Sequence, residues 1–164
     1  MTQSGSFGVN STRTYTSSYP GGLPAKPLDV GSDKRGEWLF VSASVAIAQY
    51  AFVGITGSGV AAELTTTTYA SSASIGVAQV AFASGEYGWV WVGGAGGGGT
   101  GVGIKGKVAA NYAAFAQMNT TATAGVVDDA ATKLLGGVVG LTTDGGSGSS
   151  VELQSSGTII KVTA

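Results

Sequence analysis

Short segments that alternate apolar and polar residues, or are rich in β-branched and aromatic residues, recur along most of the chain. Such segments predict β-strands, because successive side chains of a strand point to opposite faces of a sheet. Predicted strand segments lie within residues 38–41, 42–53, 75–82, 89–92 and 158–162. The sequences Gly57-Ser58-Gly59 and Ser84-Gly85-Glu86-Tyr87-Gly88 predict the turns between them. Four consecutive threonines at 65–68 also favour extended backbone, because their side chains branch at Cβ.

The segment of residues 107–118 gives a mixed signal. It is rich in alanine and places Val108, Tyr112 and Phe115 at helical spacing, which favours a helix when the segment is considered alone. Its counterpart in an internal repeat, residues 44–55, has the pattern of a strand. The repeat therefore favours a strand here.

That repeat is the main organising feature of the sequence. Residues 76–92 align without a gap with residues 137–153 at a shift of 61 (137 − 76), and residues 49–51 align with 111–113 at a shift of 62. The repeats span about 44–92 and 107–153 and are joined by the glycine-rich segment 93–103. This arrangement predicts an all-β fold, a compact β-barrel or β-sandwich built from two similar halves in one domain over residues 34–164, with an extended N-terminal arm.

Composition supports one charge-poor domain. The 164 residues suffice for a single core, 29 of them are glycine, and only 10% are charged, with a net charge of −1. We therefore expect neither nucleic acid nor a membrane as a partner, and no segment is apolar enough for a membrane helix. Soluble surfaces usually carry about 25–35% charged residues, so we expect much of this surface to be covered by other protein.

The chain contains no cysteine and no histidine, which excludes disulfides, thiolate metal sites and nucleophilic catalysis through Ser-His-Asp or Cys-His. A phosphate-loop pattern runs from Gly101 to Lys107, but Val108 stands where a hydroxyl should hold magnesium. Asp128-Asp129 and Asp144-Gly145-Gly146 are interpreted as turns in preference to calcium or acid–base sites. We expect no enzyme activity, no cofactor and no metal.

Residues 1–33 form a separate region that holds all three prolines. Proline at this density favours extended backbone, so an arm is one interpretation and a disordered tail is the other. Five spaced apolar residues favour an arm laid on a partner surface: Phe7, Tyr15, Tyr19, Leu23 and Leu28. The first residues lack the pattern of a secretory signal, so we expect synthesis in the cytoplasm.

Three segments carry a resemblance to a known family. They are IGVAQVAFASGEYGWVWV at 75–92, GKVAANYAAFAQMNTTATAGVVDD at 106–129 and GGVVGLTTDGGSG at 136–148. Together they resemble the capsid decoration (cement) proteins of tailed bacteriophages over roughly residues 36–154. The resemblance implies a non-enzymatic virion protein on the outer capsid surface, often a homotrimer, which stabilises the capsid by bridging neighbouring subunits of the major capsid protein. It implies no catalytic residue, and it implies that the N-terminal arm lies on the major capsid protein.

Two other classes of protein stay open. A phage fibre, tail or adhesin-type module would bind host-surface glycans through exposed aromatics such as Trp89 and Trp91, which share one face of a predicted strand. We favour packing of both indoles in the core, because large aromatic residues are usually buried. A self-assembling cellular surface protein would also suit the composition, although it would ordinarily carry an export signal.

Overall fold

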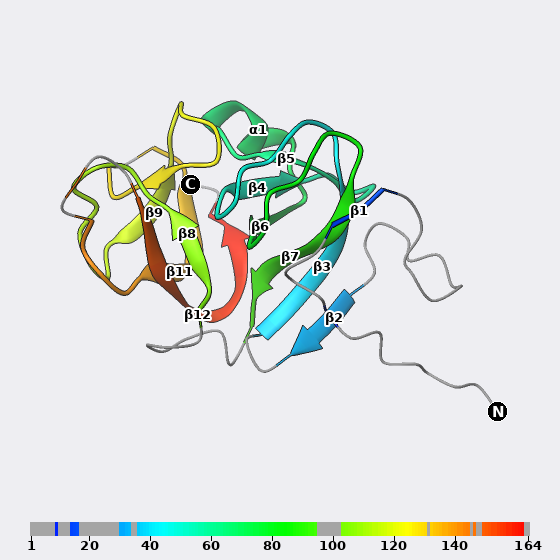
Figure 1. Cartoon of the computed structure of the whole chain (residues 1–164). Coiled ribbons are helices and arrows are strands. Elements are labelled where there is room, and N and C mark those ends of the chain that lie inside the picture. Colours follow the sequence, from blue (N-terminus) through cyan, green and yellow to red (C-terminus); the bar gives the residue numbers. More distant parts are fainter. Residues whose placement is uncertain are drawn as a thin grey trace.

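The computed structural model describes residues 9, 14–16, 30–33, 36–94, 103–130, 132–144, 146 and 149–162. These residues form an all-β fold with one short helix, arranged as two adjoining halves (Figure 1). The strands are β1 (Thr14–Tyr15), β2 (Val30–Asp33), β3 (Gly36–Ala43), β4 (Phe52–Ile55), β5 (Val60–Glu63), β6 (Ser74–Ala78), β7 (Tyr87–Gly93), β8 (Lys105–Lys107), β9 (Gln117–Thr120), β10 (Val127–Asp128), β11 (Leu134–Gly140) and β12 (Ser150–Lys161), and the helix is α1 (Thr66–Ser71).

The first half is a closed five-stranded barrel. Its strands pair in the ring β3–β7–β6–β4–β5–β3, in which only the β5–β3 pair is parallel. Side chains from all five strands form one buried cluster: Leu39, Val41, Ala43, Val53, Ile55, Ala61, Ala78, Val90 and Val92, joined by Ile47, Ala51 and Phe82. Residues from every strand of a closed ring meet only inside it, so this cluster is the barrel interior. The all-β barrel prediction is confirmed.

The second half pairs its strands by the same scheme. Strand β9 lies between β10 and β11, β11 pairs with β12, and β12 pairs with β8, all antiparallel. An isolated parallel bridge between Val108 and Val127 in the second half corresponds to the parallel β3–β5 pair of the first half. Thus β8 to β12 follow the connectivity of β3 to β7.

A turn with unusual backbone geometry occurs at the same place in both halves. The amide of Ala51 donates to the carbonyl of Ala48 at 3.2 Å, and the amide of Tyr112 donates to that of Ala109 at 3.4 Å. The third residue of each turn has a positive φ, 64° at Tyr50 and 66° at Asn111. Tyr50 and Asn111 therefore correspond to each other at a shift of 61 (111 − 50). The sequence alignment of residues 49–51 with 111–113 gave a shift of 62, which is one residue too large.

Aromatic side chains on the outer face of the barrel join it to the second half. Trp38, Phe40, Trp89 and Trp91 belong to one buried cluster that also includes the core of the second half. Strand β12 runs along the junction of the halves, and its Thr158 pairs with Gly93 (Figure 1).

Polar groups reinforce this junction at helix α1. The hydroxyl of Tyr69 donates to the carbonyl of Leu134 at 2.9 Å. The ammonium of Lys161 donates to the carbonyls of Tyr69, Ala70 and Ser72 at 2.9, 3.3 and 2.6 Å. A cation at the C-terminal end of a helix is favourable, because the last carbonyls lack partners within the helix. The two halves are therefore joined by hydrogen bonds as well as by the core.

The extended backbone predicted for the four threonines is wrong. Thr65 is the N-cap of α1: its hydroxyl accepts from the amide of Thr68, and the hydroxyl of Thr68 accepts from the amide of Thr65. This reciprocal capping box satisfies two amides that a helix start leaves unpaired and outweighs the modest preference of threonine for strands.

Several predicted strands are shorter than the sequence pattern indicates. Strand β3 ends at Ala43 and β4 begins at Phe52, with Ile47 between them in an isolated bridge to Phe82. Residues 107–118 are neither a helix nor a continuous strand, because two turns separate β8 from β9. Residues 158–161 belong to the long strand β12.

The described parts of the N-terminal region lie on the barrel. Strand β1 pairs with β7, and β2 pairs with β3. Val9 is half-buried and packs against the shared core. At least these residues of the predicted arm belong to the folded body.

Candidate docking surface

The most exposed large apolar side chain in the described structure belongs to Phe115. It is 65% exposed and lies in a tight turn, residues 113–116, that we call the Phe115 turn. Its φ of 60° is in the left-handed region, where a bulky aromatic residue is rare. Holding such a residue there costs about 1–3 kcal/mol, so the surrounding structure must enforce this conformation.

Hydrogen bonds fix this turn on every side. The amide of Ala113 donates to Oδ2 of Asp129 at 3.0 Å, and that of Ala114 donates to Oγ1 of Thr143 at 3.2 Å. The amide of Phe115 donates to the carbonyl of Gly140 at 2.8 Å. The ring of Phe115 is therefore presented to solvent from a rigid backbone.

Tyr112 supports the turn from beneath. Its side chain is fully buried, and its hydroxyl donates to the carbonyl of Ala116 at 2.6 Å and accepts from the amide of Gly140 at 3.0 Å. Burial raises the pKa of the Tyr112 phenol, and the nearby Asp129 carboxylate raises it further, whereas the Gly140 hydrogen bond opposes the shift. The phenol is thus kept neutral, which lets it both donate and accept.

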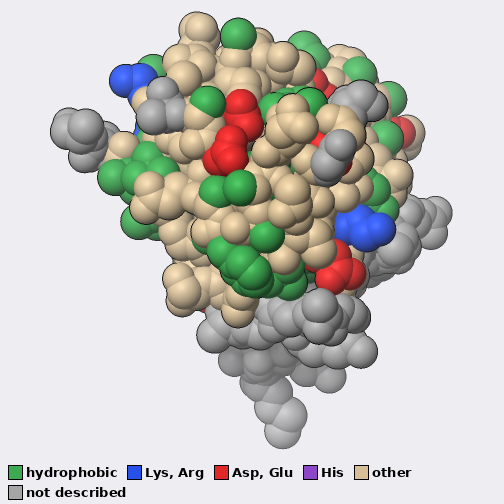
Figure 2. Space-filling view, turned by 90° about the vertical axis from the view of Figure 1, so that its left-hand side faces the viewer, with side chains coloured by type: hydrophobic (Ala, Val, Ile, Leu, Met, Phe, Trp, Pro, Cys, Tyr) green, Lys and Arg blue, Asp and Glu red, His purple; other side chains and the backbone are tan. Residues whose placement is uncertain are grey.

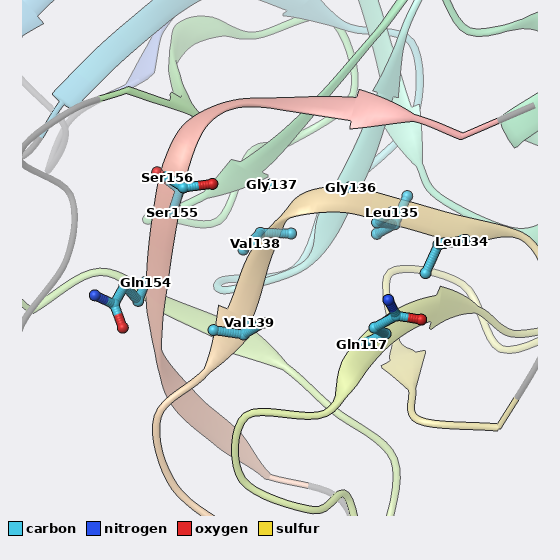
Figure 3. A pocket seen from close by; sticks show the side chains of 10 residues that line it. All are labelled: Gln117, Leu134, Leu135, Gly136, Gly137, Val138, Val139, Gln154, Ser155 and Ser156. Atoms are coloured by element: carbon cyan, nitrogen blue, oxygen red, sulfur yellow. The ribbon is translucent and has the colours of Figure 1, made fainter.

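A hollow of about 380 Å³ is lined by residues of β9, β11 and β12 (Figure 3) and includes Gln117, the residue that follows the Phe115 turn. A bulge at Gly137, where φ is 81°, interrupts the pairing of β11 with β12. The adjacent glycines 136 and 137 have no side chains to fill this space. The other lining residues are Leu134, Leu135, Val138 and Val139, with Gln117, Gln154, Ser155 and Ser156 as the polar members.

The hollow is uncharged, and more apolar surface continues beyond it. None of its lining residues is charged. At the far end, Ile160 is 54% exposed and Val162 is also exposed, and both lie close to Gly136. Figure 2 views the molecule from the side of the second half and shows apolar side chains in patches, with charged side chains scattered between them. Neutral, apolar surface of this kind is suited to protein docking.

Of the five arm residues proposed from the sequence, the structure describes Tyr15. Its side chain is 9% exposed and packs against Phe40, with ring centroids 6.2 Å apart. Tyr15 therefore packs within the fold and does not present its ring to a partner. Phe7, Tyr19, Leu23 and Leu28 lie outside the described residues.

Both tryptophans of β7 are buried, as expected for core residues. Trp89 lies edge-on to Phe40, with ring centroids 5.2 Å apart. Its indole nitrogen is buried and has no hydrogen-bond partner among the residues that the structure describes. Glycan binding through exposed Trp89 and Trp91 has no accessible ring to use in this structure.

The other sequence motifs occupy structural positions. Lys105–Lys107 is strand β8, and a bridge and a turn follow it where a phosphate-binding loop would require a helix. Asp129 supports the Phe115 turn, and Oδ1 of Asp144 accepts from the hydroxyl of Ser149 at 2.6 Å. Within the described part of the chain, no three acidic residues gather as metal ligands, and no helix could cross a membrane.

The chain matches no protein-family model, and no curated protein or solved structure is significantly similar to it. The resemblance to capsid decoration proteins therefore stays a hypothesis based on the three sequence segments.

Proposed function

We propose that this chain is a non-enzymatic virion structural protein that binds the outer surface of a phage capsid and cements neighbouring major capsid protein subunits. The observation that supports an interaction role is the Phe115 turn, a rigid aromatic projection beside an uncharged hollow. Preorganised aromatic residues are the usual anchors of protein interfaces, because little conformational entropy is lost when they bind. The capsid as partner follows from the sequence resemblance.

The sparse charge of the chain suits such a role. Burying a charged group against a partner costs free energy unless the group is paired, and this chain has few charges to bury. On a capsid, many identical sites lie side by side on one particle. When a bridging protein has more than one attachment point, modest contacts sum to strong retention.

The predicted anchors in the arm are Phe7, Tyr19, Leu23 and Leu28. Tyr15 no longer belongs among them, because it packs on Phe40. A deletion of residues 1–30 would remove β1 and uncover this part of the core, so it would confuse loss of folding with loss of binding. Serine substitution of Tyr19, Leu23 and Leu28 keeps β1 and is the sharper variant.

The direct test is a reconstruction of the phage particle that encodes the chain, together with a mutant particle that lacks it. Added purified chain should restore density on the outer shell and raise the temperature at which the head breaks. The triple serine variant should remain folded but bind poorly. Density at the tail would favour the fibre or adhesin alternative, and absence from the particle would overturn both proposals.

A further inference from the structure

The Phe115 turn and the hollow adjoin in the second half, at residue Gln117. Gln117 lines the hollow and is two residues from Phe115, so their Cα atoms are at most about 7 Å apart. In Figure 3, Gln117 and Gln154 lie on either side of β11, with Val139 between them. An aromatic projection therefore adjoins a depression with an apolar floor.

We infer that this face is a self-association surface, on which two copies of the chain pair about a twofold axis and each Phe115 ring occupies the hollow of the other copy. A twofold interface brings the same patch of both subunits together, so that patch must contain both the projecting and the receiving part. The Phe115 turn and the hollow satisfy this condition within one patch. A closed ring of three would require them on two separate faces.

The chemistry of the two parts also matches. Leu134, Val138 and Val139 offer apolar contacts to the ring, and the hollow of about 380 Å³ has room for a phenyl group. Gln117, Gln154 and Ser156 supply neutral hydrogen-bonding groups at the edge. Because a twofold axis places identical side chains near one another, a charged lining would repel itself, and this lining is uncharged.

The geometry of the turn lowers the entropic cost of this pairing. The strained φ of Phe115 and the hydrogen bonds of its neighbours hold the ring out before any partner arrives. The entropic cost of ordering the anchor is thus already met by folding. This inference does not depend on capsid binding, and it differs from the trimer that the sequence resemblance implies.

The test is the mass of the full chain in solution, measured by sedimentation equilibrium over a range of concentrations. The wild-type chain should form a dimer. Phe115→Ser should weaken dimerisation at least about tenfold, as expected for a central aromatic anchor, and Ser156→Arg should weaken it by blocking the hollow. Val45→Ser is the control: it removes another exposed apolar side chain, which belongs to the first half and does not line the hollow, and it should leave dimerisation unchanged.

A cross-linking experiment identifies the surface directly, because the chain has no cysteine of its own. A mixture of the Ala113→Cys and Gln154→Cys chains should form disulfide-linked heterodimers faster than either chain forms homodimers. A monomer at all concentrations, a trimer, or a dimer that survives both Phe115→Ser and Ser156→Arg would overturn the inference. Circular dichroism of each variant establishes that it is folded.

Discussion

The buried hydroxyl of Tyr112 lies 3.0 Å from the amide nitrogen of Gly140 and accepts its hydrogen bond. The same hydroxyl donates to the carbonyl of Ala116, so one phenol connects strand β11 to the end of the Phe115 turn. The fully buried Tyr112 thereby positions the turn that exposes the Phe115 ring. The shape of the candidate docking surface depends on this internal pairing.

Replacing Tyr112 by phenylalanine should destabilise the fold and loosen the turn. Phe keeps the packing of the ring but leaves the Gly140 amide and the Ala116 carbonyl without this partner, which should lower the free energy of unfolding by about 1–3 kcal/mol. Urea unfolding measures the loss, and hydrogen exchange at residues 113–116 measures the loosening. Tyr50→Phe is the matched control, because the Tyr50 hydroxyl makes no hydrogen bond within the described structure. Equal losses for both variants would contradict this role for Tyr112.

The raised pKa of Tyr112 predicts a loss of stability in alkali. Burial keeps the phenol neutral in the folded chain, whereas in the unfolded chain it ionises near pH 10.0. Its contribution is therefore fully present below that pH and is lost as pH rises through the higher folded pKa. Urea unfolding between about pH 8 and pH 11 should show a smaller alkaline decline for Tyr112→Phe than for the wild-type chain. Identical declines would show that Tyr112 does not drive the effect.

The sequence allowed prediction of features that depend on local alternation. Trp89 and Trp91 were placed on one face of a strand and in the core, and both are buried. The closed barrel was expected as one of two all-β forms. Alternation with a period of two predicts these features, because alternate side chains of a strand share one face of the sheet irrespective of what packs against that face.

Features that depend on specific hydrogen bonds could not be predicted from alternation. The helix at Thr66–Ser71 follows from the capping hydroxyls of Thr65 and Thr68, which outweigh residue preference. The exposure of Phe115 depends on Asp129, Gly140 and Thr143, all distant in the sequence. One signal was available: Phe115 is a single aromatic residue flanked by Ala113, Ala114 and Ala116, which offer it little local packing.

At the junction of the two halves, the side-chain amide of Gln79 pairs with the backbone of Lys105 as the backbone of a neighbouring strand would. The amide nitrogen Nε2 of Gln79 donates to the carbonyl of Lys105 at 2.9 Å, and its Oε1 accepts from the Lys105 amide at 3.0 Å. Gln79→Glu keeps the acceptor, but the ionised carboxylate cannot donate to the carbonyl. At neutral pH the variant should lose about 1–3 kcal/mol of unfolding free energy.

Acid should rescue this variant. A protonated carboxyl at residue 79 can donate to the Lys105 carbonyl, so burial and that carbonyl raise the folded pKa above the ordinary glutamate value of about 4.3. The deficit should therefore be smallest below that value and grow as pH rises through the folded pKa. Urea unfolding at about pH 4 and pH 7 tests this, with Gln79→Leu as the control whose deficit should not change with pH. A deficit of Gln79→Glu that is independent of pH would contradict the proposed pairing.

Close approach of the two halves at Gly106 makes a further prediction. A Cβ atom at this position would lie 2.7 Å from Cε2 of Phe52 and 2.8 Å from Cδ1 of Leu153, both shorter than ordinary contact distances. Gly106→Ala should therefore force Phe52 of the first half and Leu153 of β12 away from β8 and lower the free energy of unfolding by about 1–3 kcal/mol, a typical cost of overpacking. Gly57→Ala is the control, because a Cβ there meets no atom within 4 Å. Thermal and urea unfolding of the two variants provide the measurement. If Gly106→Ala were as stable as Gly57→Ala, Gly106 would not be packed as tightly against Phe52 and Leu153 as the structure shows. That result would contradict the single core shared by the two halves, on which the position of the Phe115 turn depends.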